Sequence, residues 1–450
     1  MCYRAYNRSV ISQMKVFLQT LGCKLNESEL EAWTREYAAR GDEIVTDPRA
    51  ADTIILNTCT VTAQAARKSR NLARHLAREN ENAQIVLTGC YASMSPEQAR
   101  GLPNVALIVP NADKDALVNL TRERFGDFPY FSYFSSVSQN AERAGTSGLN
   151  LRTRAFVKIE DGCNMSCAYC IIPLARGRAR SRSQNEIIDE IKSLVDNGYQ
   201  EVILTGVQIS DYRLEERENG NGRLRGLCDL VSEILRETDL PRLRLTSIAP
   251  WDLDTELLDM FADTRLCRHL HLSLQSGSTT VLRRMRRPYT AEQFADAVEM
   301  ARAKIPDVAI TTDVIVGFPG EADVEFQESI AFVERMNFAR VHVFPYSARE
   351  GTLAAKFPLH VSELVKDARA KAMQRVADAS QRNFSQQHIG RTFPVLYEEQ
   401  ANHAGIWTGY TDNYIRVTTR SNENLSNRIL PTRLVELVDD GVRGELPTND

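Results

Sequence analysis

Residues 155–170 read Ala-Phe-Val-Lys-Ile-Glu-Asp-Gly-Cys-Asn-Met-Ser-Cys-Ala-Tyr-Cys, with cysteines at positions 163, 167 and 170. The apolar, β-forming start of this stretch predicts a strand, so the cysteines fall on the loop that follows it. Three thiolates on one short loop are a way to hold an iron–sulfur cluster with one iron left open. Zinc is the competing metal, but a structural zinc site takes four ligands, and no nearby Cys or His supplies a fourth. The spacing therefore favours an open 4Fe–4S cluster on Cys163, Cys167 and Cys170, which we call the compact triad.

The strand at 155–159 is the first of a series of β segments separated by helical patterns. Further strands are predicted at 201–204, 243–247, 269–274, 308–316 and 341–344. Six β–α units predict a partial TIM-type barrel, too few for the full eight. Ligands of such barrels bind at the carboxyl ends of the strands, where the compact triad lies. A long helical stretch at about 362–387 closes this domain, which we place at 151–387.

Three more cysteines lie upstream, each at the end of an apolar run. The runs are Val-Phe-Leu-Gln-Thr-Leu-Gly-Cys23, Ile-Ile-Leu-Asn-Thr-Cys59 and Ile-Val-Leu-Thr-Gly-Cys90. Helical patterns separate them, so residues 14–125 are predicted to form a Rossmann-like domain with a parallel sheet. Because ligands of such sheets bind beyond the carboxyl ends of the strands, we expect Cys23, Cys59 and Cys90, the dispersed triad, to converge.

The remaining segments have a different character. Residues 126–150 are rich in Ser, Phe and Tyr and are predicted to be a linker. Residues 388–440 hold short β runs separated by Gly, Asn and Asp, which predicts a small antiparallel barrel. Residues 1–13 are polar and lack the apolar core of a signal peptide, and they are either a tail or a misplaced start before Met14.

Composition is that of a soluble globular protein of two or three domains. The chain has 450 residues and a formal net charge of −4, so nucleic acid would have to bind to local basic groups. No apolar run approaches the roughly 18 residues needed to span a bilayer, and we expect a cytoplasmic protein. Nine cysteines, an odd number, argue against a disulfide framework. Outside the two triads, Cys228 and Cys267 are interpreted as core residues, and Cys2 receives no role.

Residues 160–177, Glu-Asp-Gly-Cys-Asn-Met-Ser-Cys-Ala-Tyr-Cys-Ile-Ile-Pro-Leu-Ala-Arg-Gly, resemble the signature of radical S-adenosylmethionine (SAM) enzymes. The resemblance implies that SAM binds the open iron and is cleaved to a 5′-deoxyadenosyl radical, which takes a hydrogen atom from the substrate. It implies no catalytic acid or base, because the cofactors supply the chemistry.

Three further segments are similar to the N-terminal domain of the methylthiotransferases within that superfamily. They are Thr-Leu-Gly-Cys-Lys-Leu-Asn-Glu-Ser-Glu from residue 20, Asn-Thr-Cys-Thr-Val-Thr from residue 57 and Thr-Gly-Cys-Tyr-Ala from residue 88. The resemblance extends from Met14 to a C-terminal TRAM domain at 388–440. It implies a second, auxiliary 4Fe–4S cluster on the dispersed triad, two SAM molecules per turnover, and transfer of a CH3–S group.

Segments of the predicted barrel also match this family, and the resemblance implies SAM contacts there. The positions are strand-end residues: Gly206, Ser273, Gln275 and Gly317. Ordinary loop glycines and strand-end polar residues are the alternative interpretation of each.

Three branches of the family differ in substrate. Lys24-Leu25-Asn26 after the first cysteine resembles the branch that modifies N6-threonylcarbamoyladenosine beside the tRNA anticodon, although Leu174 stands where Tyr is usual. The alternatives are isopentenyladenosine in tRNA and an aspartate of a ribosomal protein. The implied partners are a tRNA anticodon stem-loop, an electron donor such as a flavodoxin or ferredoxin, and a sulfur source. An iron–sulfur electron-transfer protein is the alternative of a different class.

Local charge is consistent with RNA as a partner, although solvated surface is the alternative for each group. The basic groups lie at 67–78, 176–182 and 283–287. Acidic residues outnumber basic ones from His388 onward, so any grip of the C-terminal barrel on RNA is expected to use Trp407, Tyr410 and Tyr414.

Overall fold

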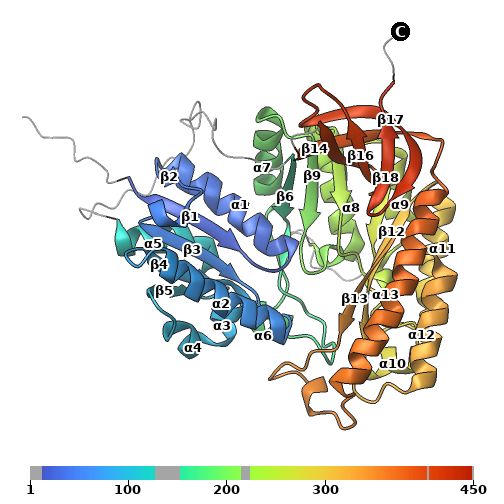
Figure 1. Cartoon of the computed structure of the whole chain (residues 1–450), viewed down its shortest axis with the longest axis horizontal. Helices are drawn as coiled ribbons and strands as arrows, with labels where there is room; N and C mark the ends of the chain where they lie inside the picture. The colour runs from blue at the N-terminus through green and yellow to red at the C-terminus, as the bar shows by residue number, and fades with distance from the viewer. Residues whose placement is uncertain (1–12, 127–152, 214–222, 403–404, 448–450) are drawn as a thin grey trace, which may run out of the picture. The chain divides into compact units, whose positions relative to one another are not determined.

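The computed structural model describes residues 13–126, 153–213, 223–402 and 405–447 (Figure 1). The chain forms two compact units, residues 1–150 with 174–176, and residues 151–173 with 177–450. Apart from Gln13 and Gly126, the predicted tail and linker lie outside the described residues. No helix in the described ranges has the length and apolar character needed to cross a membrane.

The N-terminal unit is built on a parallel sheet with the strand order β2-β1-β3-β4-β5. Its strands are β1 (Lys15–Thr20), β2 (Glu43–Ile44), β3 (Thr53–Thr58), β4 (Gln84–Thr88) and β5 (Val105–Val109). This is the flavodoxin-like order, whose direction of winding reverses between β1 and β3. Ligands of doubly wound sheets bind at such a reversal. The predicted parallel sheet is confirmed, and the edge strands β2 and β5 add to it.

Helices cover both faces of this sheet because β3 is apolar on both sides. Ile54 and Leu56 pack in one cluster with Ala73 of α2, while Ile55 packs in the other with Trp33 of α1. The helices of the first cluster are α2 (Ala63–Glu79), α3 (Gly89–Met94) and α4 (Pro96–Arg100); those of the second are α1 (Lys24–Ala39) and α5 (Leu117–Phe125). A continuous apolar strand of this kind is typical of a buried parallel sheet.

The second unit contains the predicted six-stranded partial barrel. Parallel strands form two three-stranded sheets, β10-β9-β6 and β11-β12-β13, which single bridges such as Leu243↔Leu266 connect. The strands are β6 (Arg154–Lys158), β9 (Glu201–Thr205), β10 (Arg242–Leu245), β11 (His269–His271), β12 (Ala309–Val316) and β13 (Arg340–Pro345). All six coincide with predicted strands, so the α/β class and the partial barrel are confirmed.

Helices alternate with these strands. They are α7 (Gln184–Asp196), α8 (Arg223–Glu237), α9 (Thr255–Asp259), α10 (Thr279–Arg284), α11 (Ala291–Lys304), α12 (Asp323–Met336) and α13 (Glu363–Gln386). A short helix, α6 (Ile172–Arg176), and a two-stranded ribbon of β7 (Glu160–Asp161) and β8 (Arg180–Ser181) flank the cysteine loop.

The C-terminal segment forms a closed barrel with the order β14-β15-β16-β18-β17 (red in Figure 1). Its strands are β14 (Thr392–Asn402), β15 (Ile406–Thr411), β16 (Arg416–Arg420), β17 (Arg428–Val438) and β18 (Gly441–Glu445). The parallel pairing of β16 with β18 closes it, and closure removes the exposed strand edges. The small barrel is confirmed, with β18 as a strand that was not predicted.

A buried ion network joins this barrel to the partial barrel. Glu201 of β9 accepts a 2.7 Å hydrogen bond from Arg244 Nε, and the same guanidinium donates to Asp412 O at 2.9 Å. Both side chains of this pair are fully buried. Arg242 donates to Pro394 O at 2.5 Å, and Arg154 pairs with Glu398 at 2.5 Å. The network fixes the C-terminal barrel on β6, β9 and β10.

The same contacts use the aromatic residues expected to grip RNA. Tyr410 lies under the Arg154 guanidinium at 4.7 Å, and Tyr414 lies under that of Arg244 at 5.0 Å and stacks on His269. Trp407 is buried. Trp407 belongs to the core of the C-terminal barrel, whereas Tyr410 and Tyr414 are half-buried against arginines of the partial barrel. Their role toward RNA stays a prediction.

Replacing Glu201 by Gln should strongly destabilise the second unit. Arg244 would lose its buried carboxylate partner, and removal of one member of a buried ion pair costs about 3–5 kcal/mol. The Arg244 contacts outweigh the cost of burial and hold the pKa of Glu201 down to about 2. This stabilisation is therefore complete above the ordinary carboxyl pKa of about 4.3 and is lost as pH falls through about 2.

Thermal and urea unfolding of wild type and E201Q at neutral pH measure the effect. The control is E436Q, which removes an exposed partner of Arg443 and should change stability by about 0–1 kcal/mol. Equal unfolding midpoints for wild type and E201Q would contradict the assignment.

Candidate sulfur and cluster sites

The dispersed triad lies at the carboxyl ends of three neighbouring strands. Cys23 follows β1 as the N-cap of α1, Cys59 follows β3, and Cys90 opens α3 after β4. The pKa of the Cys59 thiol is raised to about 11, first by loss of hydration and then by the charges of Cys90 and Cys23. A backbone bridge pairs Thr58 with Gly89, the residues just before Cys59 and Cys90, and a Cβ on Gly22 would lie 3.0 Å from Cys59 Sγ. The three thiols therefore lie close together, as the strand order requires. The site coincides with the reversal point of the sheet.

Glycines allow this close approach. Gly22 has φ +122°, and a Cβ there would lie 2.9 Å from Cys59 Cβ. Gly89 has φ +88°, and a Cβ there would lie 2.3 Å from Thr58 O. A larger residue before Cys23 or Cys90 would push the cysteine loops apart.

Amide side chains surround the sulfur atoms. Asn26 Oδ1 lies 3.8 Å from Cys23 Sγ, while its Nδ2 donates to Leu21 O at 2.8 Å and to Thr58 O at 3.2 Å. Asn111 Nδ2 lies 3.7 Å from Cys90 Sγ. Asn111 donates to sulfur, as groups that orient metal ligands do, whereas Asn26 Oδ1 accepts from the Cys23 thiol and loses that hydrogen bond when the thiol ionises. Sequence reasoning missed Asn111, which lies in the polar turn after β5 and far along the chain from the cysteines.

A buried cation group stands beside these amides. Arg176 donates to Asn26 Oδ1 at 2.6 Å and to Glu29 Oε1 at 3.0 Å, and Lys114 pairs with the same carboxylate. Arg176 also lowers the pKa of the Cys23 thiol, against the larger effect of lost hydration, which raises it. The site therefore offers positive charge to anionic sulfur, which fits a thiolate-bound cluster.

The compact triad occupies the loop after β6, as predicted. Cys163 N donates to Gly177 O at 3.1 Å, and Ala168 N donates to Met285 O at 2.9 Å, so both ends of the loop are held. Loss of hydration and the neighbouring Cys167 and Cys163 raise the pKa of Cys170 to about 12. Within the described ranges no three Cys, His, Asp or Glu side chains stand as ligands of a single metal ion. A cluster does not need that spacing, because each thiolate binds a different iron.

The residues predicted to contact SAM all lie at strand ends of the partial barrel. Gly206 follows β9, Ser273 and Gln275 follow β11, and Gly317 follows β12. Gln275 is buried and adopts φ 70°, an uncommon backbone conformation for this residue type. Their role toward SAM stays a prediction.

Close packing within the protein is sufficient to explain why glycine occupies positions 206 and 317. A Cβ at Gly206 would lie 2.9 Å from Glu160 Oε2, which accepts hydrogen bonds from Val207 N and Gln208 N. A Cβ at Gly317 would lie 2.3 Å from Lys366 Cγ. Loss of hydration raises the pKa of Glu160 to about 8. The Glu160 charge acts on the nearby Cys163 thiol, and the sequence did not reveal this neighbour.

The three basic groups differ in how many of their side chains are exposed and could contact RNA. On α2, Arg67, Lys68, Arg74 and Arg78 are exposed, and we call these four residues the α2 basic face. In the other two groups several members are engaged within the protein. Arg176 is buried, Arg182 pairs with Glu190, Arg284 pairs with Glu325, and Arg287 contacts Cys167. The second and third groups are therefore smaller than the sequence indicated.

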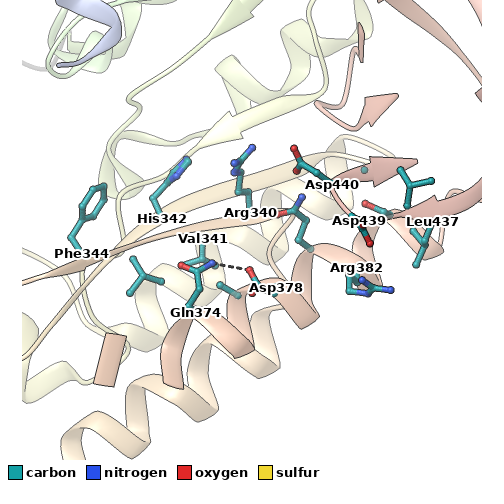
Figure 2. A pocket seen from close by; sticks show the side chains of 16 residues that line it. Arg340, Val341, His342, Phe344, Gln374, Asp378, Arg382, Leu437, Asp439 and Asp440 are labelled. Atoms are coloured by element: carbon teal, nitrogen blue, oxygen red, sulfur yellow. Dashed lines mark hydrogen bonds between the residues drawn. The ribbon is translucent and has the colours of Figure 1, made fainter. Parts of the chain in front are cut away.

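A groove of about 510 Å³ lies along the edge strand β13. Arg340, His342 and Phe344 line it from β13 (Figure 2), Gln374 and Asp378 line it from α13, and the turn between β17 and β18 closes one end. Its charges are mixed, and no predicted site residue lines it. It receives no role here.

Comparison with known proteins supports the assignment of both units. Residues 157–333 match the Radical SAM superfamily, and residues 15–110 match the Uncharacterized protein family UPF0004. The threonylcarbamoyladenosine tRNA methylthiotransferase MtaB of Bacillus subtilis (strain 168) is 35% identical over 428 residues, which cover 94% of each chain.

A second relative belongs to another branch. The tRNA-2-methylthio-N(6)-dimethylallyladenosine synthase of Erythrobacter litoralis (strain HTCC2594) is 32% identical over 404 residues, covering 87% of this chain and 88% of the relative. The structure of the radical SAM methyltransferase TsrM from Kitasatospora setae is similar in fold, with a TM-score of 0.52 and 16% identity over 74% of this chain and 75% of TsrM.

These similarities distinguish between the two classes of protein that the sequence allowed, an enzyme and an iron–sulfur electron-transfer protein. A radical SAM core, a matching N-terminal family and near full-length similarity to methylthiotransferases identify an enzyme rather than an electron-transfer protein. Its cofactors are those of the superfamily, a 4Fe–4S cluster and SAM. This chain belongs to the radical SAM methylthiotransferase family.

Proposed function

We propose that this protein adds a methylthio group to C2 of N6-threonylcarbamoyladenosine beside the tRNA anticodon, using two SAM molecules and two 4Fe–4S clusters. The observation that supports the proposal is the convergence of Cys23, Cys59 and Cys90 at the reversal point of the N-terminal sheet. A radical SAM loop alone supports many reactions, whereas a second thiolate site in the same chain supports transfer of sulfur.

Each triad would hold one cluster, and the clusters would supply one-electron cleavage of SAM at the compact triad and a sulfur-holding iron at the dispersed triad. The chain's own residues then have supporting roles. Asn111 donates its amide N–H to Cys90 and orients that ligand, and Arg176 offers positive charge near Cys23. At the compact triad, hydrogen bonds to Gly177 O and Met285 O hold the loop that presents the thiolates.

The choice of substrate rests on branch motifs and relatives. Lys24, Leu25 and Asn26 carry the resemblance to the threonylcarbamoyladenosine branch. Leu25 is buried in the structure and Lys24 is half-buried. The named function of the Bacillus subtilis relative agrees with the threonylcarbamoyladenosine branch.

A strain lacking this protein should lose the methylthio form of threonylcarbamoyladenosine from its tRNA. The unmodified threonylcarbamoyladenosine should persist, because it is the expected substrate. Nucleoside mass spectrometry of digested tRNA measures both, and re-expression of the wild-type chain is the control. Persistence of the methylthio nucleoside would contradict the proposal, and loss of methylthio-isopentenyladenosine instead would assign the other tRNA branch.

Replacing Cys23, Cys59 and Cys90 together by Ala should leave about half the iron, since only the compact triad would still bind a cluster. Cleavage of SAM to 5′-deoxyadenosine should continue, and thiomethylation should fall below detection. Iron analysis and chromatography of the SAM products measure these effects. The control is C228A, which alters a buried core thiol and should keep the full iron content. Wild-type iron in the triple variant would contradict the assignment.

Neutralising the α2 basic face should weaken binding of an anticodon stem-loop. Arg67, Arg74 and Arg78 are exposed on one helix, and each phosphate contact removed should lower the slope of log affinity against log salt by about 1. The measurement is the affinity of the R67Q/R74Q/R78Q protein for the stem-loop at several KCl concentrations. The control is R420Q, an exposed arginine of β16. Equal loss in R420Q, or an unchanged slope in the triple variant, would contradict a contact on α2.

A further inference from the structure

Arg287 belongs to the basic group at 283–287, but its side chain contacts the compact triad instead of projecting into solvent. Its segment follows α10 and is tied to the cysteine loop by the hydrogen bond from Ala168 N to Met285 O, 2.9 Å long. Its own amide donates to Leu282 O at 2.9 Å, which fixes the turn. The side chain is thereby directed to the compact triad.

Three hydrogen bonds hold the guanidinium. Nη1 donates to Cys167 Sγ at 3.3 Å, Nη2 donates to Ser273 O at 3.3 Å, and Nε donates to Tyr289 Oη at 3.2 Å. The planar fork of arginine suits such a set of separate acceptors. Tyr289 is fixed in turn, because its hydroxyl reaches Ser273 O at 2.6 Å and Leu274 O at 2.7 Å.

Aromatic rings enclose the charge. The Arg287 guanidinium carbon lies 4.9 Å from the centre of the Trp251 ring and 5.2 Å from that of Tyr289. Cation–π contacts of this kind stabilise a cation that has lost part of its hydration. In the described part of the chain, Arg287 has no carboxylate partner within ion-pair distance. The acceptors that it does have are neutral, apart from the Cys167 sulfur when that atom is a thiolate.

We propose that Arg287 is the counter-ion of the cluster on the compact triad and raises its reduction potential through the N–H donated to Cys167. The inference rests on the compact triad binding a 4Fe–4S cluster. A thiolate-ligated cluster is anionic and becomes more negative by one charge on reduction. A nearby cation and a hydrogen bond to sulfur both favour the more negative state, and both are known determinants of cluster potential. Arg287 is therefore a positioning and tuning residue, not a catalytic one.

The test is an EPR-monitored redox titration of the full chain carrying C23A, C59A and C90A, so that one cluster is observed. In this background R287Q should lower the ratio of reduced to oxidised cluster at least tenfold at a fixed potential, which is a midpoint shift of 59 mV for one electron. R287K keeps the charge and should shift the midpoint less, in the same direction. The control is R283Q, an exposed arginine of α10, which should leave the midpoint unchanged.

An unchanged midpoint in R287Q, with iron content equal to that of its parent, would overturn the inference and leave the proposed function intact. If R287Q fails to retain iron, R287K decides, since a midpoint equal to that of the parent overturns the inference and a lower one supports it. If the parent itself binds no iron–sulfur cluster, the inference and the proposed function both fail.

Discussion

Parallel strands can pair only if the chain returns to the same edge of the sheet each time, and this constraint governs where the chemistry of this protein lies. Every loop that leaves a strand at its carboxyl end emerges on one edge. In the N-terminal unit that edge carries Cys23, Cys59 and Cys90, and in the partial barrel it carries the compact triad. Thiolates that are far apart in the sequence meet because parallel pairing aligns the carboxyl ends of the strands that they follow.

Buried charge in the molecule serves two different purposes. Around Glu201, guanidinium groups meet carboxylates and backbone carbonyls, so the network is satisfied within the protein and fixes one barrel on another. Around the compact triad, the Arg287 guanidinium meets a cysteine sulfur, a carbonyl, a hydroxyl and two aromatic faces. In the described part of the chain no carboxylate pairs with this guanidinium, and its acceptors are neutral apart from the Cys167 sulfur when that atom is a thiolate. The first network stabilises the packing of one barrel on the other, and the second places a cation beside the compact triad.

The positions of the strands and of the cysteines could be predicted from the sequence, whereas the residues that surround the cysteines could not. Apolar runs mark β3 and β12 because such strands are buried on both faces, and a local pattern records burial. Asn111 and Arg176 lie on segments distant from the cysteines that they approach, so no local pattern relates them. The basic group at 283–287 misleads for the same reason: exposure of Arg283 and enclosure of Arg287 depend on packing that four neighbouring residues do not encode.

Discrimination between substrates needs residues besides the thiolates, because a thiolate binds metal and does not recognise a nucleoside. Leu174 is a position at which this chain departs from the residue usual in the threonylcarbamoyladenosine branch. Its neighbours hold its backbone in place, since Ala175 O accepts a 2.7 Å hydrogen bond from Asn111 and Arg176 is buried. Yet the Leu174 side chain is 56% exposed. A tyrosine at this position would offer a ring face and a hydroxyl, whereas leucine offers only apolar surface. The exchange therefore changes the surface that this segment exposes after the cysteine loop without altering the frame that holds the cysteines.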